Sequence, residues 1–413
     1  MYFIHFFFFI HSFSKVSHDP LTEPKFPVIQ NQGFITELNK TYLRFPKRAQ
    51  NIVKKLVWDY SLDSAGLAIY FKTNSSTISI SYKCSKPFSL PNMNLIGVSG
   101  VDILTKNDEN KWLPIQSKFL IDHKSKKITF TFSENRKSLQ GFEYRLYLPL
   151  YNSISDLLID VDDNSFFTWI EKDYSKPIVM YGTSILQGCC SSRSILSWSN
   201  LVQLHFGLPI LNFGFSGSGK LEEEVVNLIS ENEAILYVFD CLPNVYFFNT
   251  ETIKNRVKNG INLIRKKWKK VPILLVDFVG LDYQFVDKKT SIQIDNANSA
   301  QKEVVDKFVS DGDVNIFYLS KDEIGLTFEC WTDYIHPNNY GMMKYANAYI
   351  KKIESILKIS NASQKIERQV VNDVNRLNMT INLNGFTDNY KICVLSVISL
   401  FALMTIKTFV KEK

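Results

Sequence analysis

Residues Pro177–Ser184 read PIVMYGTS, an apolar run that ends in a Gly-Thr-Ser segment. Continuous apolar runs are typical of parallel strands that are covered on both faces. Four more runs follow: Pro209–Phe213, Ala234–Phe239, Val271–Phe278 and Asn315–Leu319. Helix-like patterns lie between or after them: Leu221–Ile229, Thr250–Trp268, Asn298–Val309 and Tyr340–Leu357. The alternation predicts a three-layer α/β/α domain with a parallel sheet over residues 171–360.

The preceding region, residues 25–170, has a different pattern. Its short segments alternate with a period of two and are rich in β-branched and aromatic residues: Leu67–Lys72, Thr77–Tyr82, Lys127–Phe132 and Gly141–Leu148. No long helical pattern interrupts them, so we expect an antiparallel β-sandwich. Two domains also agree with 413 residues of which 45% are apolar, a composition that excludes a disordered chain.

Charge and cysteine content exclude several classes. The net charge of +7 is spread thinly, and the densest basic run, 265–270, is interrupted by Trp268, which favours a solvated helix end over a nucleic-acid patch. The six cysteines contain no CxxC pair, so neither a structural zinc site nor another metal or cofactor is predicted. A disulfide among Cys190, Cys241 and Cys330 stays open, as does the oligomeric state.

The two ends of the chain suggest membrane targeting. Residues 2–10 (YFIHFFFFI) predict a signal peptide over 1–16, although a positive flank is missing and a buried strand or a misplaced start is the alternative. The uncharged run 392–406 predicts a transmembrane tail over 391–410, with a lipid-anchor signal or a packed helix as alternatives.

The segment before that tail, residues 361–390, is polar and rich in Asn, and we expect it to form a stalk. Four sequons fit a glycoprotein of the secretory pathway, extracellular or lumenal: Asn39, Asn74, Asn361 and Asn378.

In parallel sheets, ligands bind at the carboxyl ends of the strands. Ser184 follows the first strand, where its hydroxyl can serve as a nucleophile or as a helix N-cap. Residues 214–219 (GFSGSG) follow the second strand, and their glycines let backbone amides approach a ligand, without the Walker or dinucleotide signature. Asn244 follows the third strand after Pro243, either as a turn former or as a donor to an oxyanion.

Of the six histidines, three lie near the N-terminus, which leaves His123, His205 and His336 as candidate bases. Only His336 lies in a loop after the last predicted strand with a carboxylate, Asp333, three residues earlier. Asp333 can orient the imidazole that accepts the proton of Ser184. The combination predicts an acyl-transfer enzyme. The alternative is a membrane-tethered glycan-binding protein whose hydrolase domain is inactive.

Four segments together resemble the conserved blocks of the SGNH (GDSL-like) hydrolases, which are esterases and acylhydrolases with a flavodoxin-like α/β/α fold: GTSILQG, NFGFSGSG, DCLPN and DYIHPNNYG. The resemblance implies that Ser184 is the nucleophile and that Asp333 and His336 complete a triad. It also implies an oxyanion hole formed by Ser184, Gly217 and Asn244.

The sequence departs from most members of this family. Thr183 stands in place of Asp, and Leu242 and Pro243 replace the glycine before the Asn. These changes resemble a branch with an N-terminal β-sandwich marked by a Gly-x-Asp-Leu-Tyr signature. Gly100 and Asp102 are similar to that signature, with Leu104 in place of Tyr.

The branch implies a serine esterase for carboxylic esters. Because the sandwich suggests glycan recognition, acetyl groups on saccharides are the first expected substrate, ahead of a lipid or a small ester. The region of Gly100 and Asp102 is expected to help wall the active site. Arg193, Trp331 and Tyr334 are candidate pocket residues, with a surface cation and packed aromatic rings as the alternatives.

Overall fold

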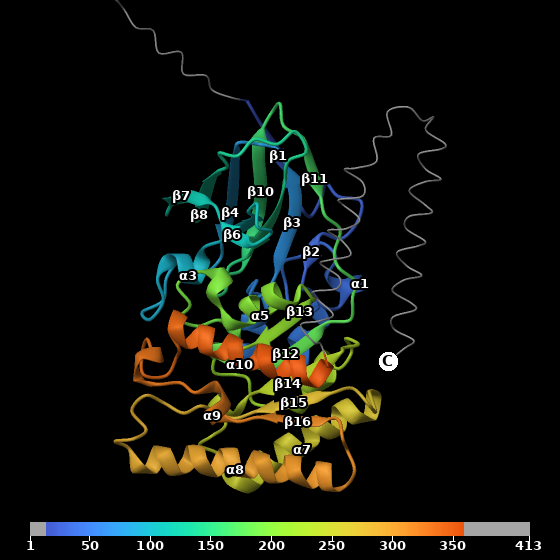
Figure 1. The fold of residues 1–413 in the computed structure, drawn as a ribbon, viewed down its shortest axis with the longest axis vertical. Coiled ribbons are helices and arrows are strands. Elements are labelled where there is room, and N and C mark those ends of the chain that lie inside the picture. The colour runs from blue at the N-terminus through green and yellow to red at the C-terminus, as the bar shows by residue number, and fades with distance from the viewer. Residues whose placement is uncertain (1–13, 359–413) are drawn as a thin grey trace, which may run out of the picture. The chain divides into compact units, whose positions relative to one another are not determined.

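This computed structural model describes residues 14–358, which form two antiparallel sheets and one parallel sheet (Figure 1). The first antiparallel sheet has the order β1 (Lys15–His18), β10 (Ile154–Asp162), β4 (Thr77–Cys84), β8 (Lys127–Ser133) and β7 (Gln116–Asp122). The second has the order β11 (Phe167–Trp169), β3 (Ala68–Thr73), β9 (Phe142–Tyr147), β5 (Asp102–Lys106) and β6 (Trp112–Pro114), with β2 (Ile29–Gln30) paired to β3.

The two antiparallel sheets enclose an apolar core, because alternate side chains of each strand point inward. In β8, Ile128, Phe130 and Phe132 are buried while their neighbours in sequence are more exposed. The four predicted strands correspond to β3, β4, β8 and β9. The first strand, β1, begins at Lys15, within the predicted leader, and pairs with β10. The rest of that leader, residues 1–13, lies outside the described part of the chain.

The parallel sheet has the order β13 (Ile210–Gly214), β12 (Ile178–Gly182), β14 (Leu236–Asp240), β15 (Ile273–Val276) and β16 (Ile316–Leu319). In chain order this is 2-1-3-4-5, the flavodoxin-like arrangement, whose ligand crevice lies at the carboxyl ends of the central strands. The register places Gly182 beside both Gly214 and Asp240. The predicted fold class is thereby confirmed.

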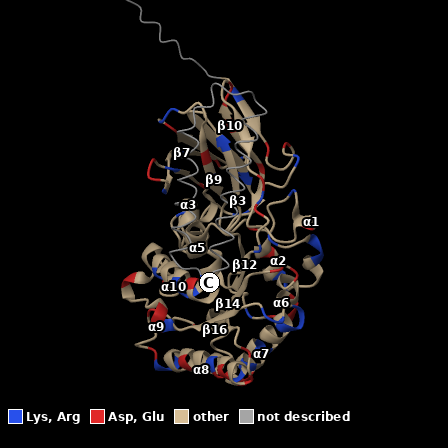
Figure 2. Ribbon diagram, turned by 45° about the vertical axis from the view of Figure 1, so that its right-hand side comes forward, with Lys and Arg blue, Asp and Glu red and all other residues tan. Residues whose placement is uncertain are grey.

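Helices cover both faces of the parallel sheet (Figures 1 and 2). α5 (Trp198–Phe206) and α10 (Asn339–Leu357) lie on one face, and α6 (Glu223–Ile229) and α7 (Thr250–Lys267) lie on the other. The remaining helices are α1 (Ile35–Leu38), α2 (Lys55–Ser61), α3 (Leu95–Ser99), α4 (Ser184–Gln187), α8 (Lys288–Ser310) and α9 (Lys321–Ile324). Short 3-10 helices occupy Lys47–Asn51, Ser194–Leu196, Leu242–Asn244 and Phe328–Cys330.

Helix α8 is longer than the sequence predicted. The apolar pattern indicated residues 298–309, but the helix begins at Lys288. Its start is defined by Asp287, which accepts hydrogen bonds from the amides of Lys289 and Thr290. The first half of α8 is mostly polar, so hydrophobic periodicity did not reveal it.

One buried arginine joins the N-terminal domain to the parallel sheet. Arg44, 2% exposed, donates to the carbonyl oxygens of Tyr60 and Asp63 in its own domain. It also donates to the carbonyl oxygens of Asn212 and Gly214 at the end of β13. Burial lowers the pKa of Arg44 to about 10, against the opposing charge of Asp63, and the group stays cationic at neutral pH.

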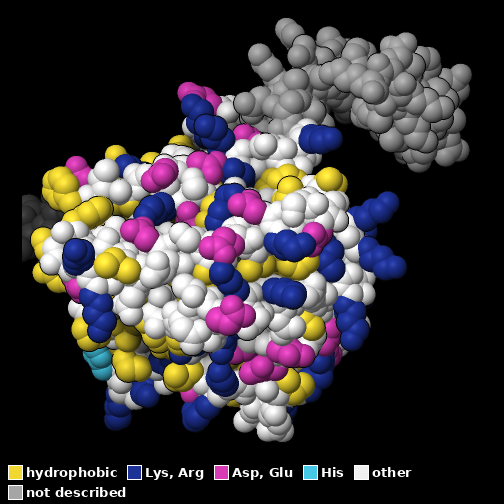
Figure 3. Space-filling model, turned by 90° about the horizontal axis from the view of Figure 1, so that it is seen from below, with side chains coloured by type: hydrophobic (Ala, Val, Ile, Leu, Met, Phe, Trp, Pro, Cys, Tyr) yellow, Lys and Arg dark blue, Asp and Glu magenta, His cyan; other side chains and the backbone are white. Residues whose placement is uncertain are grey.

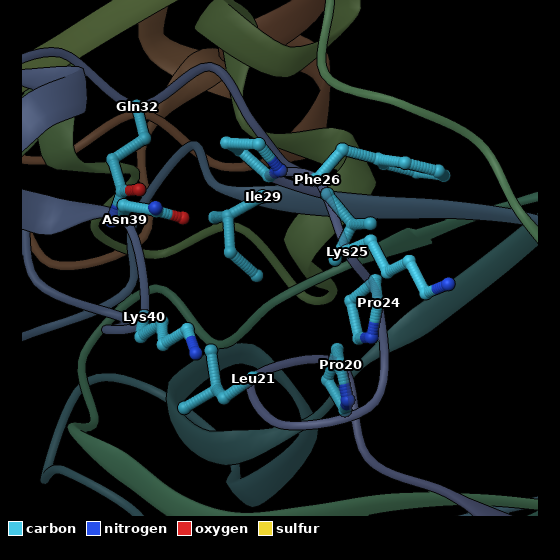
Figure 4. Close-up of a pocket in the computed structure, with 11 residues that line it drawn as sticks. Pro20, Leu21, Pro24, Lys25, Phe26, Ile29, Gln32, Asn39 and Lys40 are labelled. Carbon is cyan, nitrogen blue, oxygen red and sulfur yellow. The ribbon is translucent and has the colours of Figure 1, made fainter.

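Charges of both signs are interspersed on the surface, as the thinly spread net charge implies. Figure 3 shows this on the face that carries α8. Within residues 14–358, no helix has the length and apolar character that crossing a bilayer requires. The predicted stalk and transmembrane tail lie outside the described residues. A cavity of about 160 Å³ in the N-terminal domain is lined by residues between 20 and 40, none of which is a candidate site residue (Figure 4).

Candidate active site

Ser184 is the first residue of α4, directly after the β12 strand. The N-cap is Thr183, whose hydroxyl accepts a hydrogen bond from the amide of Ile185 at 3.3 Å. The capping interpretation of Ser184 is therefore wrong, because its neighbour fills that position. The Ser184 Oγ instead lies 2.8 Å from Nε2 of His336. The hydroxyl is thus placed to lose its proton to an imidazole.

The His336 ring is held by Asp333 in the same loop. Nδ1 of His336 lies 2.8 Å from one carboxylate oxygen of Asp333 and 3.0 Å from the other. The His336 amide also donates to Asp333, at 2.8 Å, so backbone and ring are fixed by one side chain. Of the other candidate bases, His123 lies in the turn between β7 and β8 and His205 lies in α5.

This pairing shifts the pKa values of both groups. Burial alone lowers the pKa of His336, but the hydrogen bond and negative charge of Asp333, together with a smaller contribution from Cys190, outweigh it and raise the pKa to about 9. Burial likewise raises the pKa of Asp333, yet hydrogen bonds from His336 and Asn92 hold it well below its usual range. Asp333 therefore stays ionised and favours a positive charge on the ring.

The loop after β13 requires glycine for two different reasons. A Cβ on Gly214 would lie 2.3 Å from the amide nitrogen of Gln187, and one on Gly219 would lie 2.0 Å from the carbonyl oxygen of Gly182. These two glycines allow the loop to lie directly against the β12–α4 junction. Gly217 has free space around it but a φ of 65°, a conformation that glycine adopts without strain.

Asn244 ends a 3-10 turn after β14 and is tied to the same loop. Its Oδ1 accepts a hydrogen bond from the Gly219 amide at 3.1 Å, which fixes the orientation of the side-chain amide. The Asn244 Nδ2 and the amides of Ser184 and Gly217 donate no hydrogen bond to other residues of the 14–358 region. Three donors from three strand ends thus remain available to a ligand.

Sequence reasoning missed Asn92, which comes from the N-terminal domain just before α3. Its Nδ2 donates to Asp333 Oδ2 at 2.6 Å. No pattern in the sequence marks this residue, because its role depends on how the two domains pack. The N-terminal domain therefore reaches the acid that orients His336.

Gln187, at the end of α4, was also missed. Its Oε1 accepts from the Ser216 amide at 3.1 Å, and its Nε2 donates to Asp63 and to the Leu150 carbonyl, each at 3.2 Å. Asp63 is in turn paired with Lys86 at 2.6 Å. The nucleophile helix, the glycine loop and the N-terminal domain are thereby linked through one side chain.

Asp102 of the Gly-x-Asp-Leu-Tyr-like signature holds the segment that follows α4. It accepts hydrogen bonds from the Ile195 amide at 3.0 Å and the Ser194 hydroxyl at 3.3 Å, and it pairs with Arg193 at 3.4 Å. Gly100, two residues earlier, is packed against the Ile96 backbone. Arg193 thus contacts the N-terminal domain through its ion pair with Asp102.

An open groove of about 740 Å³ lies beside Asp333. It is lined by residues 89–95 of the N-terminal domain and residues 332–334. Tyr334 is on its rim and 67% exposed, whereas Trp331 and Arg193 are not among the lining residues. Cys190, Cys241 and Cys330, whose pairing the sequence left open, are free thiols.

Two family models match the chain. Residues 175–354 match the GDSL-like Lipase/Acylhydrolase family, and residues 18–167 match a domain described as the N-terminus of Esterase_SGNH_hydro-type. No curated protein matches.

Solved structures are similar over most of the chain. A Bacteroides ovatus protein described as a GDSL-like lipase is 25% identical, with a TM-score of 0.76 over 84% of this chain and 99% of its own. A salicylyl-acyltransferase from a tetracycline biosynthetic pathway is 17% identical, with a TM-score of 0.61 over 77% of this chain and 90% of its own. The chain belongs to the GDSL-like lipase/acylhydrolase family, in the branch with a GxDLY N-terminal domain, and is an SGNH hydrolase of the esterase and acylhydrolase class.

Proposed function

We propose that this esterase cleaves carboxylic esters through a triad of Ser184, His336 and Asp333. The observation that carries the proposal is the continuous chain of contacts from Ser184 Oγ to His336 at 2.8 Å and from His336 to Asp333 at 2.8 Å. Ser184 Oγ attacks the ester carbonyl carbon while His336 Nε2 takes its proton. His336 then protonates the leaving alcohol, and water hydrolyses the acyl-enzyme by the same route in reverse.

The negative oxygen formed in each step needs hydrogen-bond donors. We assign this role to the amides of Ser184 and Gly217 and to Nδ2 of Asn244, the three donors without partners described above. Removal of one such donor costs about 2.7–4 kcal/mol of transition-state stabilisation, or about 10²–10³ in kcat. We therefore expect Asn244→Ala to lower kcat by this factor with a small change in KM, measured with an aryl acetate. A loss confined to KM would contradict the assignment.

The nucleophile and base are tested by Ser184→Ala and His336→Ala. Each is expected to abolish hydrolysis of an aryl acetate, and Ser184→Ala is expected to abolish labelling by a fluorophosphonate probe. Ser197→Ala is the matched control, since Ser197 is buried and its hydroxyl has no partner in the described chain. Undiminished turnover in both variants would exclude the triad, and an unlabelled wild-type protein would favour the glycan-binding alternative.

We propose a short acyl group on a polar carrier, such as an acetylated saccharide, as the substrate. The support is the groove beside Asp333, which is open and has hydroxyl and amide side chains, Ser89, Asn92, Asn94 and Thr332, among the apolar residues of its lining. Such groups match the hydroxyls of a sugar better than an alkyl chain. We expect kcat/KM to fall from acetyl to butyryl to octanoyl esters. A rise with chain length would favour a lipid.

We also propose that the protein enters the secretory pathway. The leader-like residues 2–10 suggest this, and the sequon residue Asn39 is exposed at the end of α1, where a glycan can be attached. A glycosidase-sensitive mass shift that Asn39→Gln reduces would support it, and an unmodified Asn39 in protein from the native cell would argue against it.

A further inference from the structure

Two adjacent thiols lie next to the candidate triad and have no part in the proposed hydrolysis. Cys189 and Cys190 follow α4 directly and are 3% and 8% exposed. Cys190 has a φ of 69°, a left-handed conformation that is uncommon for a residue with a Cβ. In this conformation the two sulfur atoms lie 3.4 Å apart. The chain thus accepts backbone strain where these two thiols meet.

A third donor completes the cluster. A ring nitrogen of His336 and the two sulfur atoms all lie within 4.8 Å of one another. A carboxylate oxygen of Asp333 lies 3.9 Å from the Cys190 sulfur and offers a fourth ligand. Two sulfurs, an imidazole nitrogen and a carboxylate oxygen form a donor set that suits Zn²⁺ and related thiophilic cations.

The spacing also fits such a cation. With zinc–sulfur bonds of about 2.3 Å, a tetrahedral site places two sulfur ligands about 3.8 Å apart. The observed separation of 3.4 Å is close to that value. The largest separation in the cluster, 4.8 Å, has to shorten by about 1 Å, a movement within the range of side-chain rotation. The side chains of His336 and Asp333 are 15% and 24% exposed, and Asp333 lines the groove, so an ion can approach the cluster past Asp333.

We propose that a thiophilic divalent cation of the zinc class binds to Cys189, Cys190 and His336 and switches off hydrolysis at Ser184. On binding, each thiol releases its proton to solvent and becomes a thiolate ligand. An imidazole bound to the cation cannot keep its contacts with both Ser184 and Asp333, so it no longer serves as the base. The inhibition rests on the proposed function, whereas the binding rests on the cluster alone.

Binding is tested by titrating the full chain with Cd²⁺ and recording the near-ultraviolet absorption of cadmium–thiolate bonds. We expect saturation at one ion per chain, and at least a tenfold weaker affinity in Cys189→Ser and in Cys190→Ser, since even outer-shell changes cost about 10–100-fold at metal sites. Cys84→Ser, which removes a buried thiol from β4, is the matched control and is expected to bind as wild type. Should serine unfold the chain, alanine at the same positions removes the ligand without adding a hydroxyl.

Inhibition is measured in parallel with Zn²⁺, with each protein normalised to its own metal-free rate of aryl acetate hydrolysis. We expect Zn²⁺ to inhibit the wild type and EDTA to restore its rate, and the double variant Cys189→Ser/Cys190→Ser to need at least tenfold more Zn²⁺. Ser184→Ala keeps all ligands and is expected to bind Cd²⁺ without hydrolysing esters. Cadmium binding by a wild type without esterase activity would disprove the proposed function alone. Equal Cd²⁺ affinity, or equal sensitivity to Zn²⁺, in wild type and double variant would overturn the cation site.

Discussion

The two domains contribute to the site in different ways. In the α/β domain, Ser184, Gly217 and Asn244 each follow a strand end, because parallel strands with aligned register end at one edge of the sheet, and Asp333 and His336 lie in the loop before α10. In the sandwich, the strands form the core, and one strand residue, Asp102 at the start of β5, holds the segment after α4. The other contacts toward the site come from segments outside the strands, at Arg44, Asp63 and Asn92. Parallel topology thus indicates where function lies, whereas an antiparallel sandwich places functional residues wherever its loops meet a partner.

The largest expected effect lies in the α/β domain, at the acid. Asp333→Asn keeps the shape of the side chain but no longer fixes the ring tautomer of His336 or balances its charge. We expect kcat for an aryl acetate to fall by about 10³–10⁴-fold. Asp322→Asn, an exposed substitution on α9, is the control. A loss of less than tenfold would mean that the acid does not orient the base.

The next effect concerns the domain contact. Arg44→Met keeps the stem but leaves four carbonyl oxygens without their donor, at a cost of about 3–5 kcal/mol in the free energy of unfolding. Arg48→Ala is the contrast, because Arg48 joins Glu37 to Glu231 on the surface, and exposed pairs contribute about 1 kcal/mol or less. Urea denaturation of both variants gives the comparison. Equal shifts in the urea midpoint of the two variants would show that the buried contact of Arg44 stabilises the fold no more than the exposed ion pairs of Arg48.

A smaller effect follows from the raised pKa of His336, about 9. The base must be neutral to accept the Ser184 proton, and a raised pKa moves the neutral form to higher pH. We expect kcat/KM to rise about 50-fold from pH 7 to pH 9, since the neutral fraction rises by that factor. Ser184→Ala supplies the blank for uncatalysed hydrolysis. In Asp333→Asn the midpoint of the pH profile of kcat/KM should move down toward pH 6.5. A wild-type midpoint below pH 7 would contradict the raised pKa of His336.

The fold class and the positions of the main candidate residues could be predicted from the sequence because each signal is local. The run before Ser184 identifies a buried strand, and the Asp333–His336 spacing fits one turn. Asn92 lies 241 residues from Asp333 in sequence, and its contact exists only after the domains pack. The role of Gln187 could not be predicted for the same reason, because its contacts with Asp63 and Leu150 exist only after the domains pack. The polar first half of α8 was missed because its helical start depends on the Asp287 cap rather than on apolar periodicity.

The smallest effect tests the comparison most directly, because Asn92 is the residue of the N-terminal domain that contacts the acid. Asn92→Ala removes the 2.6 Å hydrogen bond to Asp333, and such bonds to charged groups contribute about 1.5–3 kcal/mol. We expect kcat to fall by about tenfold or somewhat more, while the unfolding midpoint stays within the range of Asn164→Ala, an exposed control on the same domain. If Asn92 only lined the groove, KM would rise and kcat would not change. A decrease in kcat would instead show that the sandwich domain acts on catalysis through the orientation of Asp333, so the α/β domain alone would not form a complete active site.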